Sequence, residues 1–171
     1  MHESKLDAAA AAALPKAELY AQLHEELRGL LAGETDFIAN LANSAALIFH
    51  ALPVLNWAGF YLLKQGELVV GPFQGKPACV RIALGKGVCG TAAVRRESII
   101  VRDVNEFAGH IACDAASNSE IVIPLLRGDQ VLGVLDLDSP RQSRFDEDDR
   151  RGLEGVVAIL MEAVSGHRHD T

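Results

Sequence analysis

Hydrophobic positions along the chain follow a helical period in some segments and an extended one in others. Apolar residues recur at three- and four-residue steps in three segments, which predicts amphipathic helices over about 15–31, 35–52 and 146–164. Between the second and third helices, apolar runs bounded by turn residues predict strands at 56–63, 67–73, 78–84, 98–104, 120–126 and 130–137. A short helix is expected at 88–95, and turns at 64–66 and 127–129 indicate two hairpins.

The order of these elements predicts an α+β fold. Its hairpins imply an antiparallel sheet of about six strands, with the N- and C-terminal helices packed on one face. The sequence contains no internal repeat or linker, so we expect a single domain over 15–171, preceded by an extension over 1–14. Segment 105–119 fits neither period, and an irregular segment of this length in a compact domain is commonly functional.

Composition and charge exclude several classes of protein. Apolar residues make up 49% of the 171 positions, which is typical of a globular domain and not of a disordered chain. A formal net charge of −7 argues against nucleic acid as a partner. No apolar run approaches the roughly 20 residues that cross a membrane. The alanine tract at 8–13 is short and flanked by Glu3 and Asp7, unlike an export signal, so we expect a cytoplasmic protein.

Three cysteines, an odd number in a reducing compartment, are more often free, catalytic or metal-bound than structural. Cys79 begins a predicted strand, and Cys89 lies in the first turn of the short helix, where a thiol pKa is lowered. A small buried hydrophobic residue is the commoner role of a single cysteine, but Cys113 has polar neighbours. The spacing of His110 and Cys113 is only a weak indication of a metal site.

Acidic residues gather at one end of the second hairpin. Because side chains alternate along a strand, Asp136 and Asp138 share a face with Leu132 and Val134 if the strand extends that far. Glu120 begins the partner strand, near the same end of the sheet. Carboxylates on a buried face require a cation or a shared proton. The alternative is a shorter strand, with Asp138 opening the next turn and Glu120 solvated.

Two aromatic residues share a face of the first predicted strand. Trp57 and Tyr61 are four residues apart, so their side chains point to the same side. Aromatic residues at this spacing usually belong to a core. The same pair is also suited to an apolar wall that receives a methyl group or a cation.

Four stretches of the chain are distinctive: NWAGFY at 56–61, GPFQG at 71–75, GKGVCG at 85–90 and HIACDAASNSE at 110–120. Together they closely resemble the free methionine-(R)-sulfoxide reductases, a family of single-domain GAF proteins. The resemblance extends from about Trp57 to Phe145 and is most distinctive around Cys113. It implies a GAF fold, in agreement with the order of helices and strands, and an enzyme that reduces the free amino acid.

The resemblance also implies a role for each candidate residue. Cys113 matches the nucleophile that takes the oxygen and becomes a sulfenic acid, Cys79 matches the resolving cysteine, and Cys89 matches the third cysteine of the family. The acidic residues that match those holding the substrate amine and delivering a proton are Glu120, Asp136 and Asp138. The residues that match the aromatic wall around the methylsulfinyl group are Trp57 and Tyr61.

This chemistry follows from ordinary reactivity. A sulfoxide is a poor electrophile until its oxygen is protonated, so a thiolate and an acid must act together. A second thiol then converts the sulfenic acid into a disulfide, and an external dithiol protein such as thioredoxin reduces it. We therefore expect no metal and no organic cofactor. The family and the apolar terminal helices also suggest a homodimer.

Two other functions use the same fold. A GAF domain that senses a small molecule without turnover would place its pocket in the same position, with incidental cysteines. A redox-sensing protein would form a disulfide without substrate specificity. Fold alone does not decide among them, but the combination of cysteines and acids favours the enzyme.

Overall fold

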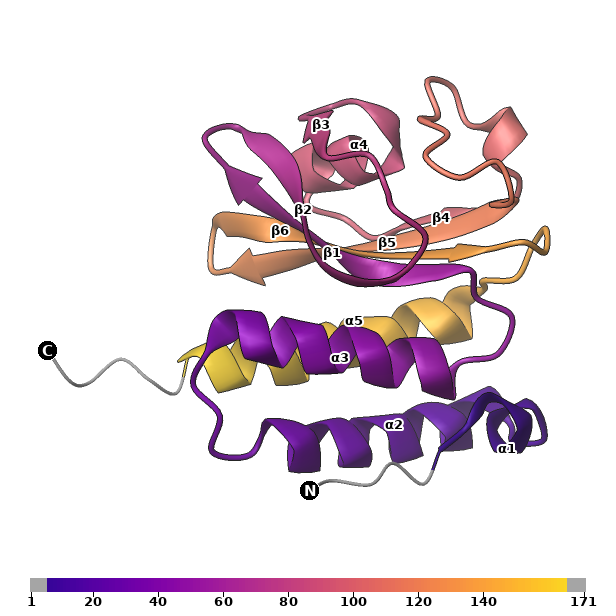
Figure 1. Ribbon diagram of the computed structural model, residues 1–171, viewed down its shortest axis with the longest axis vertical. Helices are drawn as coiled ribbons and strands as arrows, with labels where there is room; N and C mark the ends of the chain where they lie inside the picture. The colour runs from indigo at the N-terminus through magenta and orange to yellow at the C-terminus, as the bar shows by residue number, and fades with distance from the viewer. Residues whose placement is uncertain (1–5, 166–171) are drawn as a thin grey trace, which may run out of the picture.

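A six-stranded antiparallel sheet forms the centre of the protein, which the computed structural model describes over residues 6–165 (Figure 1). In spatial order its strands are β3 (Arg81–Ala83), β2 (Glu67–Gly75), β1 (Trp57–Lys64), β6 (Gln130–Ser139), β5 (Ser119–Arg127) and β4 (Ile99–Val101). Every neighbouring pair is antiparallel. The predicted α+β class and the two hairpins are confirmed.

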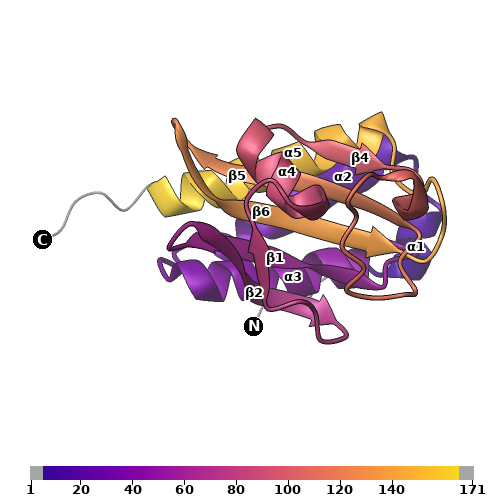
Figure 2. The ribbon, with the colours of Figure 1, turned by 90° about the horizontal axis from the view of Figure 1, so that it is seen from above.

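Helices cover the two faces of the sheet unequally. Those near the chain ends are α1 (Ala8–Ala12), α2 (Lys16–Leu31), α3 (Phe37–Ala51) and α5 (Glu147–Ser165). Figure 1 shows α3 and α5 directly under the sheet and α2 in a further layer beneath them. The other face carries α4 (Gly87–Arg95), the 3₁₀ turn η1 (Val104–Glu106) and the long loop before β5 (Figure 2). The prediction that the terminal helices share one face is confirmed.

The main hydrophobic core lies between the sheet and the terminal helices. Each of these helices turns one apolar stripe inward, as its sequence period requires, and Leu23, Leu41, Ile48, Leu153 and Val156 are fully buried there. A second, smaller cluster lies on the opposite face, beneath α4. That second cluster is interrupted by polar side chains. None of the helices in the described part of the chain is long and apolar enough to cross a bilayer.

Two predicted strands are longer than the real ones, and one predicted alternation is wrong. Strands β3 and β4 contain three residues each because they are sheet edges, with pairing on one side only. Strand β6 does extend to Ser139, so Asp138 belongs to it. A bulge lies between the pairs Leu125–Gly133 and Leu126–Val131, which leaves Leu132 unpaired. Leu132 therefore packs against the helix layer and not on the face of Asp136.

A buried cluster of charges joins the start of α2 to the start of α5. Asp149 accepts hydrogen bonds from Lys16 Nζ at 2.6 Å, Tyr20 Oη at 2.8 Å and Arg144 NH1 at 3.3 Å. Its other contact is the backbone N–H of Asp146, which caps α5 reciprocally as the sequence predicts. The Arg144 guanidinium also donates to the carbonyl of Pro53, so the cluster also fixes the chain entering β1.

Replacing Asp149 with asparagine is expected to lower the free energy of unfolding by about 3–5 kcal/mol. The physical reason is that the side chain of Arg144 is only 3% exposed and would keep its charge without a partner. Urea denaturation measures the change. As a matched control, Asp148→Asn removes an exposed charge from the same helical turn and should cost less than about 1 kcal/mol. Equal losses in both variants would contradict the importance of this cluster.

Candidate active site

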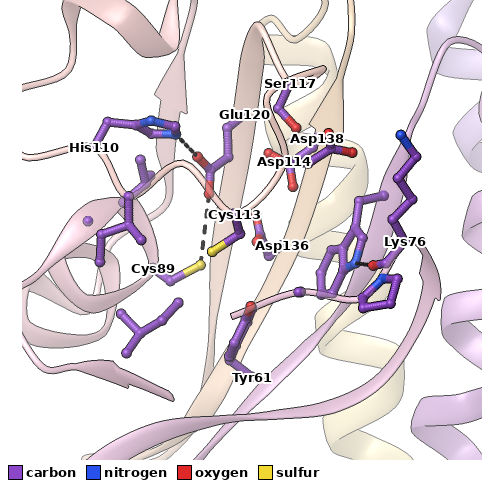
Figure 3. Close-up of a pocket in the computed structure, with 17 residues that line it drawn as sticks. Tyr61, Lys76, Cys89, His110, Cys113, Asp114, Ser117, Glu120, Asp136 and Asp138 are labelled. Atoms are coloured by element: carbon purple, nitrogen blue, oxygen red, sulfur yellow. Dashed lines mark hydrogen bonds and ion pairs between the residues drawn. The ribbon is translucent and has the colours of Figure 1, made fainter. Parts of the chain in front are cut away.

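Register across three strands brings the predicted acidic residues together. Asp138 of β6 lies between Trp57 of β1 and Glu120 of β5 as their direct cross-strand partner. Asp136 lies one step along the same face, opposite Gly59. Because alternate residues of a strand share a face, all three carboxyl groups point away from the helix layer and into one pocket (Figure 3). The longer of the two strands that the sequence allowed is thus confirmed, with Asp136 and Asp138 on one face and Glu120 at the same end of the sheet.

The pocket lies between the sheet, α4 and the long loop before β5. Its free space is about 540 Å³, part of which is open to solvent. All the predicted site residues line it except Cys79, whose sulfur is bonded to a lining residue. The complete lining is Trp57, Tyr61, Lys76, Pro77, Ala78, Ile82, Gly87, Val88, Cys89, His110, Ile111, Cys113, Asp114, Ser117, Glu120, Asp136 and Asp138.

Burial raises the pKa of all three carboxyl groups in this cluster. Glu120 is 6% exposed, and desolvation together with the charge of Asp138 raises its pKa to about 8. Desolvation and the neighbouring carboxylates also raise the pKa of Asp136 and of Asp138 well above the ordinary range. Like charges this close cannot all ionise away from water. The cluster can therefore hold a proton near neutral pH.

One oxygen of the cluster lacks a partner in the protein. Asp136 Oδ1 is buried and accepts no hydrogen bond from any described residue. A buried acceptor without a donor is unfavourable, by about 1–3 kcal/mol. Since this oxygen belongs to a side chain that lines the pocket, a donor group of a ligand would remove the penalty. An ammonium group is such a donor.

An aromatic stack forms one wall of the pocket. The ring centroids of Trp57 and Tyr61 are 5.8 Å apart, and Phe73 also stacks on Trp57, with a centroid distance of 5.2 Å. Gly59 makes this stack possible because a Cβ there would lie 2.3 Å from Phe73 Cβ. The predicted common face of Trp57 and Tyr61 is thereby confirmed, and the wall is an apolar surface beside the acids.

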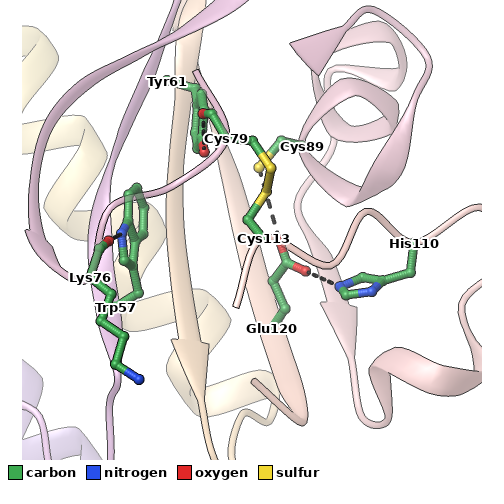
Figure 4. Close-up of a disulfide and its surroundings, with 8 residues drawn as sticks. All are labelled: Trp57, Tyr61, Lys76, Cys79, Cys89, His110, Cys113 and Glu120. Atoms are coloured by element: carbon green, nitrogen blue, oxygen red, sulfur yellow. Dashed lines mark hydrogen bonds and ion pairs between the residues drawn. A yellow bond between two sulfur atoms is a disulfide. The ribbon is translucent and has the colours of Figure 1, made fainter. Parts of the chain in front are cut away.

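A disulfide joins Cys79 and Cys113 beside this pocket (Figure 4). The two cysteines come from different segments, 34 residues apart in the sequence, one preceding β3 and the other in the long loop before β5. Tyr61 Oη donates a hydrogen bond to the carbonyl of Cys79 at 3.0 Å, which ties the disulfide to the aromatic wall. The disulfide excludes an isolated buried thiol as the role of Cys79 in this state.

Cys89 is a free thiol on the inner side of the same pocket. Its Sγ lies 3.9 Å from Glu120 Oε1, to which it donates a weak hydrogen bond. Complete burial and the charges of Asp136, Glu120 and Asp138 raise the pKa of Cys89 well above the ordinary value. The acids thus outweigh the helix N-terminus that the sequence analysis considered, and Cys89 is a neutral thiol here.

The long irregular segment supplies polar groups that the sequence analysis did not assign to the site. His110 Nε2 lies 3.4 Å from Glu120 Oε2, and burial holds the pKa of His110 below its usual range. Asp114 accepts a hydrogen bond from Asn56 Nδ2 at 3.2 Å, and the same amide group contacts Ser117 Oγ at 3.0 Å. These residues fall inside the sequence stretches that carry the resemblance, which is the only signal that could have found them.

The donor atoms of Cys89, Glu120 and Asp136 lie within 4.8 Å of one another, a spacing that a metal ion could bridge. Metal ligands must lose their protons, whereas all three of these groups have a raised pKa and favour the protonated form. The weakly indicated pair of His110 and Cys113 does not form a site, because Cys113 is bonded to Cys79. Binding of a metal ion to Cys89, Glu120 and Asp136 would therefore compete with protonation of these groups.

Comparison with known proteins identifies relatives over most of the chain. Residues 41–165 match the family model described as the GAF domain. The free methionine-R-sulfoxide reductase of Escherichia coli is 56% identical over 145 residues, which are 85% of this chain and 88% of that protein. The enzyme of the same name from Saccharomyces cerevisiae is 45% identical over 155 residues, 86% of each chain.

A solved structure is similar over almost the whole chain. It is the X-ray structure of free methionine-R-sulfoxide reductase from Neisseria meningitidis in complex with its substrate, with a TM-score of 0.91 and 40% sequence identity. The match covers 98% of each chain, so it includes every element that surrounds the pocket. The likeness is therefore one of fold and of sequence.

The raised pKa of Glu120 predicts that stability falls as pH rises from about 4.5 to about 8. The folded protein holds this proton to about pH 8, whereas the ordinary value is 4.5. The stabilisation is therefore complete below the ordinary value and is lost as pH rises through about 8, at up to about 1.4 kcal/mol per pH unit. Urea denaturation of the disulfide-bonded protein across this range is expected to show the decline.

Glu120→Gln should reduce the slope of this decline, with a remainder from Asp136 and Asp138, whose pKa shifts have the same direction. Glu106→Gln, at an exposed position on η1, is the matched control and should keep the wild-type slope. An unchanged slope in Glu120→Gln would mean that Glu120 is ionised in the folded protein.

Proposed function

Because this chain belongs to the free methionine-R-sulfoxide reductases, a family of GAF-domain proteins, we propose that it reduces free L-methionine (R)-sulfoxide to L-methionine. The observation that carries the proposal is the position of the Cys79–Cys113 disulfide beside a pocket that contains three buried carboxyl groups with a raised pKa. A thiol that can be oxidised and an acid that can protonate an oxygen are the two groups that sulfoxide reduction needs.

Substrate binding follows from the polarity of the pocket walls. The ammonium group of the free amino acid would be held by Glu120, Asp136 and Asp138, and the partnerless Oδ1 of Asp136 supports this placement. The methyl group on sulfur would pack against Trp57 and Tyr61, which are 3% and 2% exposed. An ammonium among carboxyl groups favours their ionised form, so binding leaves one carboxylate to pair with it and another group protonated.

The chemical step transfers oxygen from substrate to enzyme. Glu120 or Asp138 protonates the sulfoxide oxygen, which makes the sulfur electrophilic. The Cys113 thiolate attacks the activated sulfoxide. The sulfur–oxygen bond of the substrate breaks, the oxygen becomes bonded to the Cys113 sulfur as a sulfenic acid, and methionine leaves. Sulfur in the substrate is reduced by two electrons, and the cysteine sulfur is oxidised by two.

The second half of the cycle restores the thiols. The Cys79 thiol attacks the sulfenic acid, a sulfur–sulfur bond forms, and the oxygen leaves as water. An external dithiol protein of the thioredoxin type then reduces this disulfide by exchange and is itself oxidised. The Cys79–Cys113 disulfide of the structure supports this half of the cycle. We place the reaction in the cytoplasm, where such reductants are kept reduced, and a homodimer stays a prediction.

Cys89 has a different place in this scheme. Cys89 is a buried neutral thiol that donates a weak hydrogen bond to Glu120, and a neutral thiol is a poor nucleophile. The pairing of Cys113 with Cys79 supports these two as the reacting cysteines. We propose that Cys89 assists catalysis by holding Glu120 Oε1 in place.

Turnover with dithiothreitol as reductant is expected for the R epimer of free methionine sulfoxide and not for the S epimer. Cys113→Ser should abolish turnover because the attacking thiolate is lost. Cys79→Ser should still release one equivalent of methionine per enzyme and then leave a sulfenic acid that dimedone labels. Methionine release is the measurement. Cys89→Ser, which removes the thiol but keeps a hydroxyl donor for Glu120, should still release the first equivalent.

Turnover that survives in Cys113→Ser would assign the nucleophile to Cys89 or Cys79. Absence of turnover of either epimer by folded, reduced wild-type protein would contradict the reductase proposal altogether. The sensor interpretation would then be the better account of this pocket. Binding of free methionine sulfoxide without methionine release, measured by calorimetry, would identify that case.

N-acetylation of the substrate is expected to abolish productive binding. The acetyl group removes the positive charge that the acid cluster would hold, and an uncharged amide leaves the buried carboxyl groups without their partner. We expect kcat/KM for N-acetyl-methionine (R)-sulfoxide to be lower by about 100-fold or more, the loss that an unpaired buried charge produces. Turnover equal to that of the free amino acid would contradict the assigned position of the ammonium.

A further inference from the structure

The proposed substrate carries a carboxylate for which the acid cluster offers no place. A free amino acid has its ammonium and its carboxylate on the same carbon atom. If the ammonium is held by Glu120, Asp136 and Asp138, the carboxylate must lie a few ångströms away from the same acids. Like charges at this distance repel strongly in a pocket of low dielectric. A cation at the edge of the pocket is therefore needed.

Lys76 is the only lysine or arginine among the residues that line the described pocket. Its side chain is exposed, and it forms no ion pair and no hydrogen bond through its ammonium group with any residue in the range 6–165. A lysine that already paired with a protein carboxylate would be unsuited to a ligand. The ammonium group of Lys76 is therefore available to a ligand.

The backbone of Lys76 is held firmly although its side chain is exposed. Its carbonyl oxygen accepts a hydrogen bond from Trp57 Nε1 at 3.1 Å, which ties it to the aromatic wall (Figure 4). The preceding Gly75 has a φ of +127°, and a Cβ there would lie 2.7 Å from the carbonyl oxygen of Asn56. The side chain of Lys76 thus begins from a fixed point on the wall of the pocket.

Lys76 lies at the end of the pocket that contains Asp114 and Asp138 (Figure 3). The charge of Lys76 contributes to the lowered pKa of Asp114, which agrees with this proximity, although the backbone N–H of Ala116 is the largest cause. Cys113, in contrast, belongs to the opposite side, together with Cys89. A substrate with its amino acid end near Asp138 would therefore have its α-carboxylate within reach of Lys76.

We propose that Lys76 binds the α-carboxylate of the substrate and so selects a free amino acid over one blocked at its carboxyl end. The assignment rests on the proposed function, because it takes methionine sulfoxide as the ligand. The acid cluster recognises the ammonium and Lys76 recognises the carboxylate, so the two together read both charges of the zwitterion. A terminal residue of a peptide carries only one of these two charges, the ammonium at the N-terminus or the carboxylate at the C-terminus.

The test compares two substrates with two variants of Lys76. The substrates are free L-methionine (R)-sulfoxide and its α-carboxamide, measured with dithiothreitol at a pH that keeps both ammonium groups protonated. Lys76→Met removes the charge and keeps the length of the side chain, Lys76→Arg keeps the charge, and Lys64→Met is the matched control at the far end of β1.

For Lys76→Met we expect KM for the free acid to rise about 10- to 100-fold, the range for a hydrogen bond to a charged group. Its kcat should change little, because the lost contact is made equally in the ground and transition states. Turnover of the carboxamide should be the same in Lys76→Met as in wild type, which also shows that the variant is folded. Lys76→Arg should stay within about threefold of wild type for the free acid.

An unchanged preference of Lys76→Met for the free acid over the carboxamide would overturn the assignment. The carboxylate would then belong elsewhere on the wall, such as the start of α4, whose Gly87 and Val88 also line the pocket. Failure of the proposed function has a different signature. In that case wild type reduces neither compound, whereas failure of this inference leaves wild-type turnover intact.

Discussion

The chemistry of this protein depends on the register of three adjacent strands. Pairing of Asp138 with Trp57 on one side and Glu120 on the other places two carboxyl groups and an indole in one row, with Asp136 in the next. A shift of β6 by one residue would turn both aspartates toward the helix layer. The large apolar core on that other face opposes such a shift, because it would bring charged groups into contact with leucines and isoleucines.

The cost of burying these acids is limited by protonation. A protonated carboxyl group is an ordinary polar group, so the penalty of an isolated buried charge does not arise. The remaining support comes from outside the pocket. The Asp149 cluster joins α2 to α5. Through Arg144 it also contacts the carbonyl of Pro53, just before β1, the strand that supplies the aromatic wall of the pocket. Stability and site geometry are linked by that strand.

Much of this arrangement could be predicted from the sequence, and the failures have physical reasons. Alternation along β6 predicted the shared face of Asp136 and Asp138, but whether Asp138 belonged to the strand depended on partners distant in sequence. The face of Leu132 was predicted wrongly because a bulge adds one residue without changing the apolar pattern. The joining of Cys79 to Cys113 followed only from the resemblance, since no local pattern relates residues 34 positions apart. His110 was missed as a partner of Glu120 because loop positions have no period.

A neutral acid cluster can perform two tasks that conflict in a charged one. Holding an ammonium requires a carboxylate, whereas donating a proton to a sulfoxide oxygen requires a carboxylic acid. Because the groups are close enough to prevent full ionisation, the ammonium can induce one ionisation while another group keeps its proton. In the proposed reaction, proton transfer to the sulfoxide would then leave a second carboxylate beside the first. In the proposed reaction, burial of the cluster is thus what would let it both bind the substrate and supply it with a proton.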